Sequence, residues 1–340
     1  IPLMNEGLGE LKCRRHFVQD FKGNGEWIME LALKITQMVA PVIAMIGLGC
    51  LCRKKQYIDH KGLAGLKGLI GNITLPAVLF NAFLTASYSM RVLLVFAVVY
   101  VGFGIALGFG FLTRRFVKPY DRFMPFLLSS AEGGMLGYAL FALIGGSGAT
   151  SVFATVDIGQ TMFAYTVYLS ALKITDGQKT GARDVLAGLV SNKACLGMAA
   201  GIILGVSGAG SAVLGSQIGG IVTSLINFIT APTAGVILIV VGYELELRRE
   251  LMAPVVKTVL LRLAVLAAVL AAGSAVIFAA TPFDKELFMA MLLMYALPAP
   301  FIIPLFADTG EDGAYISTTL SVGTLMTVVF FIGIAAYSAA

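Results

Sequence analysis

Long runs of apolar residues recur along this chain and are separated by short polar segments. Because a bilayer core about 30 Å thick is crossed by about 20 helical residues, the runs predict ten spans. Their approximate bounds are 29–52, 62–84, 91–113, 122–145, 150–173, 184–206, 216–243, 254–280, 286–307 and 314–338. Continuous runs of this length differ from the alternating pattern of membrane β-strands. The sequence therefore predicts an all-α polytopic membrane protein with ten transmembrane helices.

Composition excludes a water-soluble globule. Of the 340 residues, 58% are hydrophobic and 13% are charged, whereas about 25% are charged in soluble domains. The net charge of +5 does not indicate a nucleic-acid partner, because the basic residues gather in short loops, where they indicate topology.

The basic residues also predict an orientation. They cluster in the connections that follow the first, third, fifth and seventh spans. These residues are Arg53, Lys54 and Lys55; Arg114, Arg115, Lys118 and Arg122; Lys173, Lys179 and Arg183; and Arg248, Arg249 and Lys257. Since cytoplasmic loops carry an excess of lysine and arginine, we expect these connections inside the cell and both termini on the extracytoplasmic side of the cell membrane. Residues 1–28 precede the first run and are interpreted as an N-terminal extension of uncertain nature.

The chain contains an internal repeat. The stretch FMPFLLSSAEGGMLGYALFALIG, from Phe123, aligns without gaps with FMAMLLMYALPAPFIIPLFADTG, from Phe288, and nine of 23 positions are identical. We therefore divide the chain into two five-helix repeats, 29–173 and 184–340, joined by a cytoplasmic linker at 174–183. Because five is odd, corresponding helices cross the membrane in opposite directions, as in inverted-repeat transporters. The alternative is chance similarity between apolar helices.

The repeat pairs two sites of helix interruption. Where the first copy has Glu132-Gly133-Gly134, the second has Leu297-Pro298-Ala299-Pro300. Glycine frees the backbone, and proline removes an amide donor and clashes with the preceding turn. We therefore expect helices 4 and 9 to be broken midway and to cross one another. Unpaired peptide groups are tolerated at membrane depth only where they line a cavity, so the crossing is the predicted binding site.

Two acidic residues, Glu132 and Asp157, lie near the middle of predicted spans. Intramembrane carboxylates are costly and usually functional, although a plain hydrogen bond between helices is an alternative role for each. Two carboxylates beside one cavity do not readily stay ionised together, so we expect coupling to H⁺ or Na⁺. The residues predicted to carry this coupling are Glu132, Asp157, Gln160 and Ser321.

Eight residues are predicted to contact the substrate. The predicted substrate-binding residues are Asn81, Glu132, Gly133, Gly134, Gly137, Pro298, Ala299 and Pro300.

The sequence has no paired-histidine metal motif, no nucleotide-binding loop, and no cysteines at metal-ligand spacing. We therefore predict no catalytic residue, no resident metal or cofactor, and a function other than that of an enzyme.

With these residues in view, the chain resembles the auxin efflux carrier family. The stretches that carry the resemblance are GLGCLCRKKQYID, LKGLIGNITLPAVLFNAF, EGGMLGYALF, TAPTAGVILIVVGYEL and ALPAPFIIPLFA. The resemblance implies a fold similar to that of bile acid:sodium symporters. It also implies a scaffold of helices 1, 2, 6 and 7, and a transport domain of helices 3–5 and 8–10 that slides past it in elevator-type alternating access.

The resemblance further implies a secondary transporter of a small organic anion. The family commonly has an Asn-x-Gly-x-x-Gly-x-Pro pattern at the first crossing helix; here Glu132 replaces the asparagine and Ala139 the proline, while Gly134 and Gly137 are kept. Expected substrates are mono- or dicarboxylates, malate-like, malonate-like or auxin-like. Two alternatives are a sodium-coupled symporter of larger amphipathic acids and a membrane sensor that does not transport. A scaffold on one side would allow a homodimer.

Overall fold

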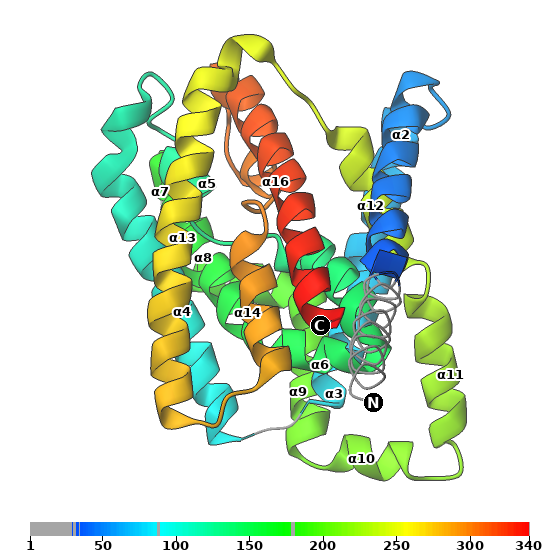
Figure 1. Ribbon diagram of the computed structural model, residues 1–340. Helices are drawn as coiled ribbons and strands as arrows, with labels where there is room; N and C mark the ends of the chain where they lie inside the picture. Colours follow the sequence, from blue (N-terminus) through cyan, green and yellow to red (C-terminus); the bar gives the residue numbers. More distant parts are fainter. Residues whose placement is uncertain (1–28, 30–31, 34, 87–88, 178–180, 340) are drawn as a thin grey trace, which may run out of the picture.

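The computed structural model describes residues 29, 32–33, 35–86, 89–177 and 181–339, and within these residues all regular secondary structure is helical (Figure 1). Six helical segments of this described part are long and apolar enough to cross a membrane: Ile35–Lys54, His60–Leu84, Met90–Val117, Gly219–Glu244, Arg249–Ala280 and Gly310–Ala339. The predicted helical, multi-pass membrane protein is confirmed. The arrangement as ten spans in two inverted repeats stays a prediction, and the predicted extension, residues 1–28, lies outside the described residues.

One group of helices contains the first described helix, Ile35–Lys54, together with α2 (His60–Leu69), α3 (Leu75–Leu84), α9 (Lys193–Val206), α11 (Gly219–Thr230) and α12 (Thr233–Glu244). Here α3 packs along α9 and against α11. Helix Ile35–Lys54 approaches α12 backbone to backbone, because a Cβ atom on Gly49 would lie 2.8 Å from the Tyr243 nitrogen and one on Gly242 would collide with the Ile46 carbonyl. Small residues permit this close approach between membrane helices.

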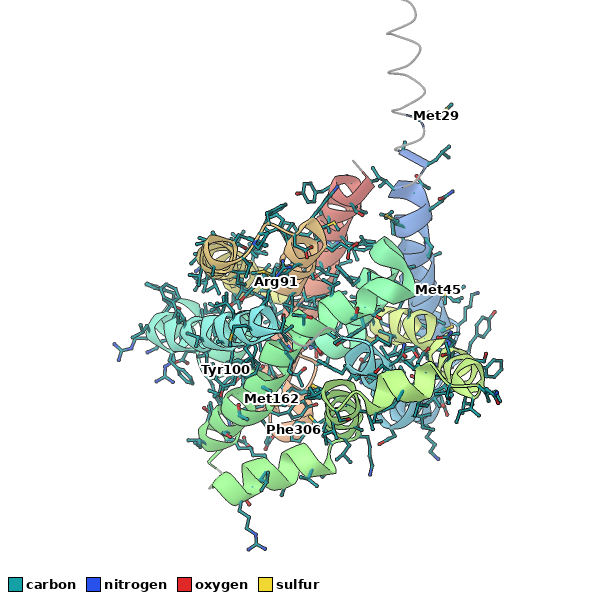
Figure 2. The ribbon with its side chains drawn as sticks, turned by 90° about the horizontal axis from the view of Figure 1, so that it is seen from below. Met29, Met45, Arg91, Tyr100, Met162 and Phe306 are labelled. Carbon is teal, nitrogen blue, oxygen red and sulfur yellow. The ribbon has the colours of Figure 1, made fainter. Side chains whose placement is uncertain are left out.

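A second group contains α4 (Met90–Thr113), α5 (Met124–Leu128), α6 (Tyr138–Phe163), α13 (Met252–Ala280), α14 (Lys285–Ala296) and α16 (Gly313–Ala339). In this group α4 packs against α6 and α13, and α14 packs against α6 and α16. The ring of Phe103 stacks at 6.0 Å on Phe163 and at 5.0 Å on Tyr295, which joins α4, α6 and α14. The two groups meet where α6 contacts α3 and α12, and Figure 2 shows Met45 and Tyr100 on opposite sides of the molecule.

Both predicted helix breaks are present. Helix α5 ends at Leu128, and helical structure resumes with a π-helical turn, η3 (Gly133–Gly137). Helix α14 ends at Ala296, and a short helix, α15 (Ile303–Phe306), follows after six residues that include Pro298 and Pro300. Ser130 has a positive φ of 60°, a conformation that does not continue a right-handed helix.

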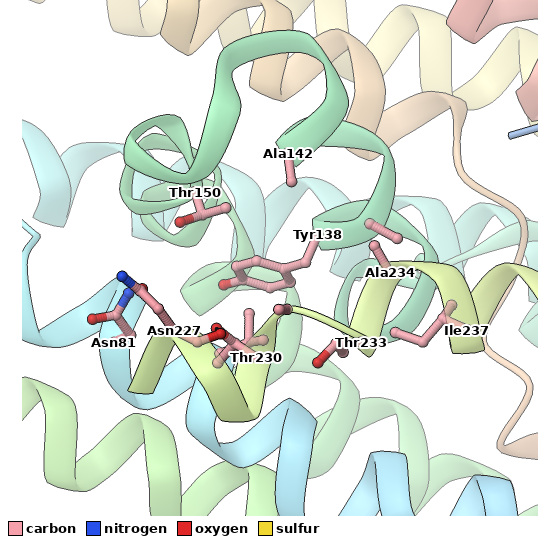
Figure 3. Close-up of a pocket in the computed structure, with 12 residues that line it drawn as sticks. Asn81, Tyr138, Ala142, Thr150, Asn227, Thr230, Thr233, Ala234 and Ile237 are labelled. Carbon is pink, nitrogen blue, oxygen red and sulfur yellow. The ribbon is translucent and has the colours of Figure 1, made fainter. Parts of the chain in front are cut away.

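The predicted boundary between the fourth and fifth spans, residues 145–150, lies inside one helical segment, α6. The ring of Phe153 nevertheless lies 5.0 Å from that of Tyr138 and 5.4 Å from that of Phe141. Fifteen residues of straight helix would span about 22 Å, so α6 must fold back on itself. Figure 3 shows Ala142 and Thr150 on the two arms of this reversal.

The remaining helices differ in detail from the predicted spans. The sixth span is divided at Asn192 into α8 (Ala182–Ser191) and α9, and a short helix, α10 (Ala209–Leu214), follows. The side chain of Asn192 caps α9 by accepting a hydrogen bond from the Cys195 amide at 3.0 Å. The seventh span is divided between α11 and α12, next to Pro232. The α6 segment continues through η4 (Ala164–Tyr168) into α7 (Leu169–Thr175).

Candidate functional site

The two broken segments satisfy each other's backbone hydrogen bonds. In an unbroken helix, each amide donates to the carbonyl four residues earlier. The Glu132 amide instead donates to the Pro298 carbonyl of the other segment at 3.0 Å. The Phe301 amide, which would donate to Leu297 in a continuous helix, donates to Oε2 of Glu132 at 2.7 Å. The carboxylate of Glu132 therefore takes the place of a helical carbonyl, and we call this junction, where hydrogen bonds join the two broken segments, the crossing.

A buried arginine from a third helix completes the crossing. Arg262 of α13 is 5% exposed. One of its terminal nitrogens donates to the carbonyls of Leu127 at 3.0 Å and Ser129 at 3.3 Å. The other donates to the carbonyls of Ser130 at 2.6 Å and Leu297 at 2.8 Å. These carbonyls end the helical segments α5 and α14, where carbonyl groups lack helical partners and attract positive charge.

The predicted site residues omit Arg262, although its sequence signal was present. It is a charged residue inside the apolar run 254–280, and intramembrane charges are functional candidates by the same rule that selected Glu132 and Asp157.

A cavity of about 170 Å³ opens beside the crossing. It brings together five of the predicted residues, which are Glu132, Gly134, Asp157, Gln160 and Pro300. Helix α3 contributes Leu75 and Leu79 to its lining. Because α3 and α6 belong to different helix groups, the cavity lies on the boundary between the groups.

Asp157 is fully buried and only partly satisfied. Its Oδ2 atom accepts a hydrogen bond from the Thr161 hydroxyl at 3.2 Å. Its Oδ1 atom has no partner within hydrogen-bond distance among the described residues, and the Tyr138 hydroxyl lies near the same carboxylate. A Cβ atom on Gly133 would collide with this Oδ1 atom, so the carboxylate reaches the broken segment itself. A buried charged atom without a partner is costly. A proton bound to the carboxylate would remove its charge, and a cation bound at Oδ1 would give that atom a partner.

Gln160 connects the cavity lining to the first broken segment. Its side-chain nitrogen donates to the Ser130 hydroxyl at 3.0 Å and to the Ala131 carbonyl at 2.5 Å. Its side-chain oxygen lies 3.3 Å from the Thr161 hydroxyl, whose single proton is shared between this oxygen and Asp157. Asp157, Thr161 and Gln160 thus form one continuous polar chain that ends at the break.

Two predicted residues lie in other cavities. Asn81 faces a cavity of about 210 Å³ that is also lined by Tyr138, Asn227 and Thr230 (Figure 3). Ser321 faces a cavity of about 100 Å³ together with Lys67 and Glu244, which form an ion pair. The Ser321 hydroxyl accepts a hydrogen bond from the Glu246 amide at 2.8 Å. The structure therefore does not bring Asn81 or Ser321 into the cavity of Glu132 and Asp157.

Four further predicted residues, Gly133, Gly137, Pro298 and Ala299, shape the crossing but do not line the 170 Å³ cavity. Pro298 accepts the hydrogen bond from the Glu132 amide, and Ala299 is buried. Gly137 packs so closely that an added Cβ atom would lie 2.9 Å from Leu297 and would collide with Phe153. Their positions are those of packing residues.

A comparison with family models identifies the protein class. The model described as membrane transport protein, which represents the auxin efflux carrier family, matches residues 34–334. The chain belongs to this family. The predicted resemblance is confirmed, and the chain is a membrane transporter that sits in a lipid bilayer. A transporter family is consistent with a protein that is not an enzyme. A comparison with curated proteins finds no match.

Proposed function

We propose that this transporter carries a small organic anion, a mono- or dicarboxylate of the malate-like, malonate-like or auxin-like kind, and binds it at the crossing of the two broken segments. The observation that carries this proposal is the cavity between the helix groups, where Glu132, Asp157 and the reciprocal bonds of the breaks converge. Irregular backbone at membrane depth is typical of substrate sites in transporters.

The size of the cavity supports a small solute. Its volume is about 170 Å³, whereas sites for drug-sized ligands have about 300–1,000 Å³. The other cavities on the same boundary have about 210 and 100 Å³. These volumes favour a small carboxylate over the larger amphipathic acids of the alternative hypothesis.

The charges at the site support coupling to a cation. With Glu132 and Asp157 both ionised, the site carries two negative charges and one positive charge, that of Arg262. An anionic substrate would therefore meet a net negative charge. We infer that a proton or a sodium ion binds with the substrate, and that the unpartnered Oδ1 atom of Asp157 is the place where it binds. The Thr161 hydroxyl, which also contacts Gln160, holds that carboxylate in position.

The division of the helices supports elevator-type movement. In our proposal, helix Ile35–Lys54, α2, α3, α9, α11 and α12 form the scaffold, and the group of α4, α5, α6, α13, α14 and α16 carries the crossing across the membrane. The 170 Å³ cavity and the cavity of Asn81 are each lined by both groups, so sliding of one group against the other would change their access.

Transport measurements in proteoliposomes test the proposal. Purified protein is reconstituted, and uptake of radiolabelled mono- and dicarboxylates is measured under separate proton and sodium gradients. We expect one small carboxylate to be accumulated and Gly134→Leu, which fills the cavity, to abolish its uptake. Accumulation that survives Gly134→Leu, or binding of every candidate without uptake, would contradict the proposal, and the second result would favour a sensor.

A further inference from the structure

We propose that Arg262 is a positioning residue that supplies a fixed cation to the crossing, so that the carbonyl ends of the broken segments need no inorganic cation. The role that this gives Arg262 in transport rests on the proposed function, whereas its role at the carbonyl ends does not. The proposal assigns any coupling ion to Asp157 and excludes a second ion from the carbonyl cluster.

The geometry of the guanidinium carries this inference. Arginine presents its N–H donors in a planar, rigid fork. One terminal nitrogen holds Leu127 and Ser129, which belong to a single chain segment. The other bridges Ser130 and Leu297, which belong to different segments. The guanidinium therefore both satisfies the first break and links it to the second.

The chemistry of the acceptors points to the same role. All four hydrogen bonds described for Arg262 end on backbone carbonyl oxygens. Unwound carbonyls and the C-terminal ends of half-helices are also the groups that coordinate sodium in transporters with broken helices. Here the Arg262 guanidinium already binds these carbonyl groups. Because it is covalently attached, it cannot dissociate during the transport cycle.

The position of Leu297 shows why a cation is needed there. The Phe301 amide, its partner in a continuous helix, is bound to the Glu132 carboxylate instead. The Leu297 carbonyl is bound to Arg262 at 2.8 Å. The missing helical hydrogen bond is thus replaced by two others, one from the Phe301 amide to the Glu132 carboxylate and one from Arg262 to the Leu297 carbonyl. Both backbone groups keep a partner although the helix is interrupted.

The first test is chemical rescue of Arg262→Ala. This variant removes the cation and leaves a space the size of a guanidinium group beside the four carbonyls. We expect its thermal unfolding midpoint to fall and its uptake to fall by at least about tenfold to a hundredfold, because that is the loss expected for a single charged hydrogen bond and this variant loses four. Low millimolar guanidinium should raise both toward the wild-type values, and Arg262→Lys should retain part of them. Arg91→Ala is the control. It removes an arginine at the start of α4 that pairs with Asp284 at 3.1 Å, and guanidinium should not rescue it.

Two results would overturn the inference. One is an Arg262→Ala protein that folds but recovers neither stability nor uptake with guanidinium. The other comes from Asp157→Asn, which keeps Arg262 and removes the proposed ion site. Its unfolding midpoint should be the same in sodium and in choline, and a sodium-dependent rise would reveal a cation site at the carbonyls. The second test remains available if Arg262→Ala does not fold. Failure of the proposed function would instead appear as absent uptake by wild-type protein, with both thermal results unchanged.

Discussion

Replacing Glu132 by glutamine removes a charge but keeps the length and shape of the side chain. In the structure the carboxylate accepts the Phe301 amide at 2.7 Å. Hydrogen bonds to charged groups contribute about 1.5–3 kcal/mol, against about 0.5–1.5 kcal/mol for neutral ones. The substitution should therefore weaken the crossing by about 1–1.5 kcal/mol, or about tenfold in an equilibrium constant. The backbone bond from Glu132 to Pro298 is unaffected, so the protein should still fold.

The assay is uptake of the accumulated carboxylate by proteoliposomes, with and without a proton or sodium gradient. We expect Glu132→Gln to lower the rate about tenfold. It should also remove the dependence on the driving ion, because the charge of Arg262 would then balance that of Asp157 without a further cation. Glu250→Gln is the matched control, because Glu250 is exposed in the short 3₁₀ turn Arg249–Leu251 and should leave the rate and the dependence unchanged. A Glu132→Gln variant with the wild-type ion dependence would refute the assignment of Glu132 to coupling.

Three further predictions follow from the same contacts. Gly133→Ala should lower the unfolding midpoint and the rate of uptake, because the added Cβ atom would collide with Asp157 and overpacking costs about 1–3 kcal/mol. Its control, Gly65→Ala, has open space around the added atom and should change neither. Gly49→Ala should destabilise the protein by a similar amount and Gly47→Ala should not, since only Gly49 meets the backbone of α12; equal thermal midpoints would be evidence against this packing. Asp157→Asn should make uptake insensitive to the driving ion, and retained sensitivity would move the ion site elsewhere.

The sequence predicted the helix breaks well because their causes are local. Glycine and proline act on the backbone at their own positions, so Gly133, Gly134, Pro298 and Pro300 identify the breaks without knowledge of the fold. A loop was predicted at residues 145–150, whereas the structure is helical there and α6 reverses between Phe141 and Phe153. In the structure, packing of Phe153 against Tyr138 holds the reversal, and this contact depends on tertiary structure.

The candidate site was predicted only in part, because depth along a helix does not determine which cavity a side chain faces. Glu132, Asp157 and Gln160 share one cavity, as expected. Asn81 and Ser321 also lie on helices that border the boundary between the groups, but they face separate cavities. The partners of Arg262 come from segments more than 30 residues away, and no local pattern contains that information.

An experimental density map of the protein in lipid nanodiscs, with its transported carboxylate bound, tests the central claim most directly. We predict open backbone at residues 129–132 and 297–302, with solute density in contact with Glu132 and next to Asp157. Continuous helices through either stretch, or solute density confined to the cavity of Asn81, would contradict the account.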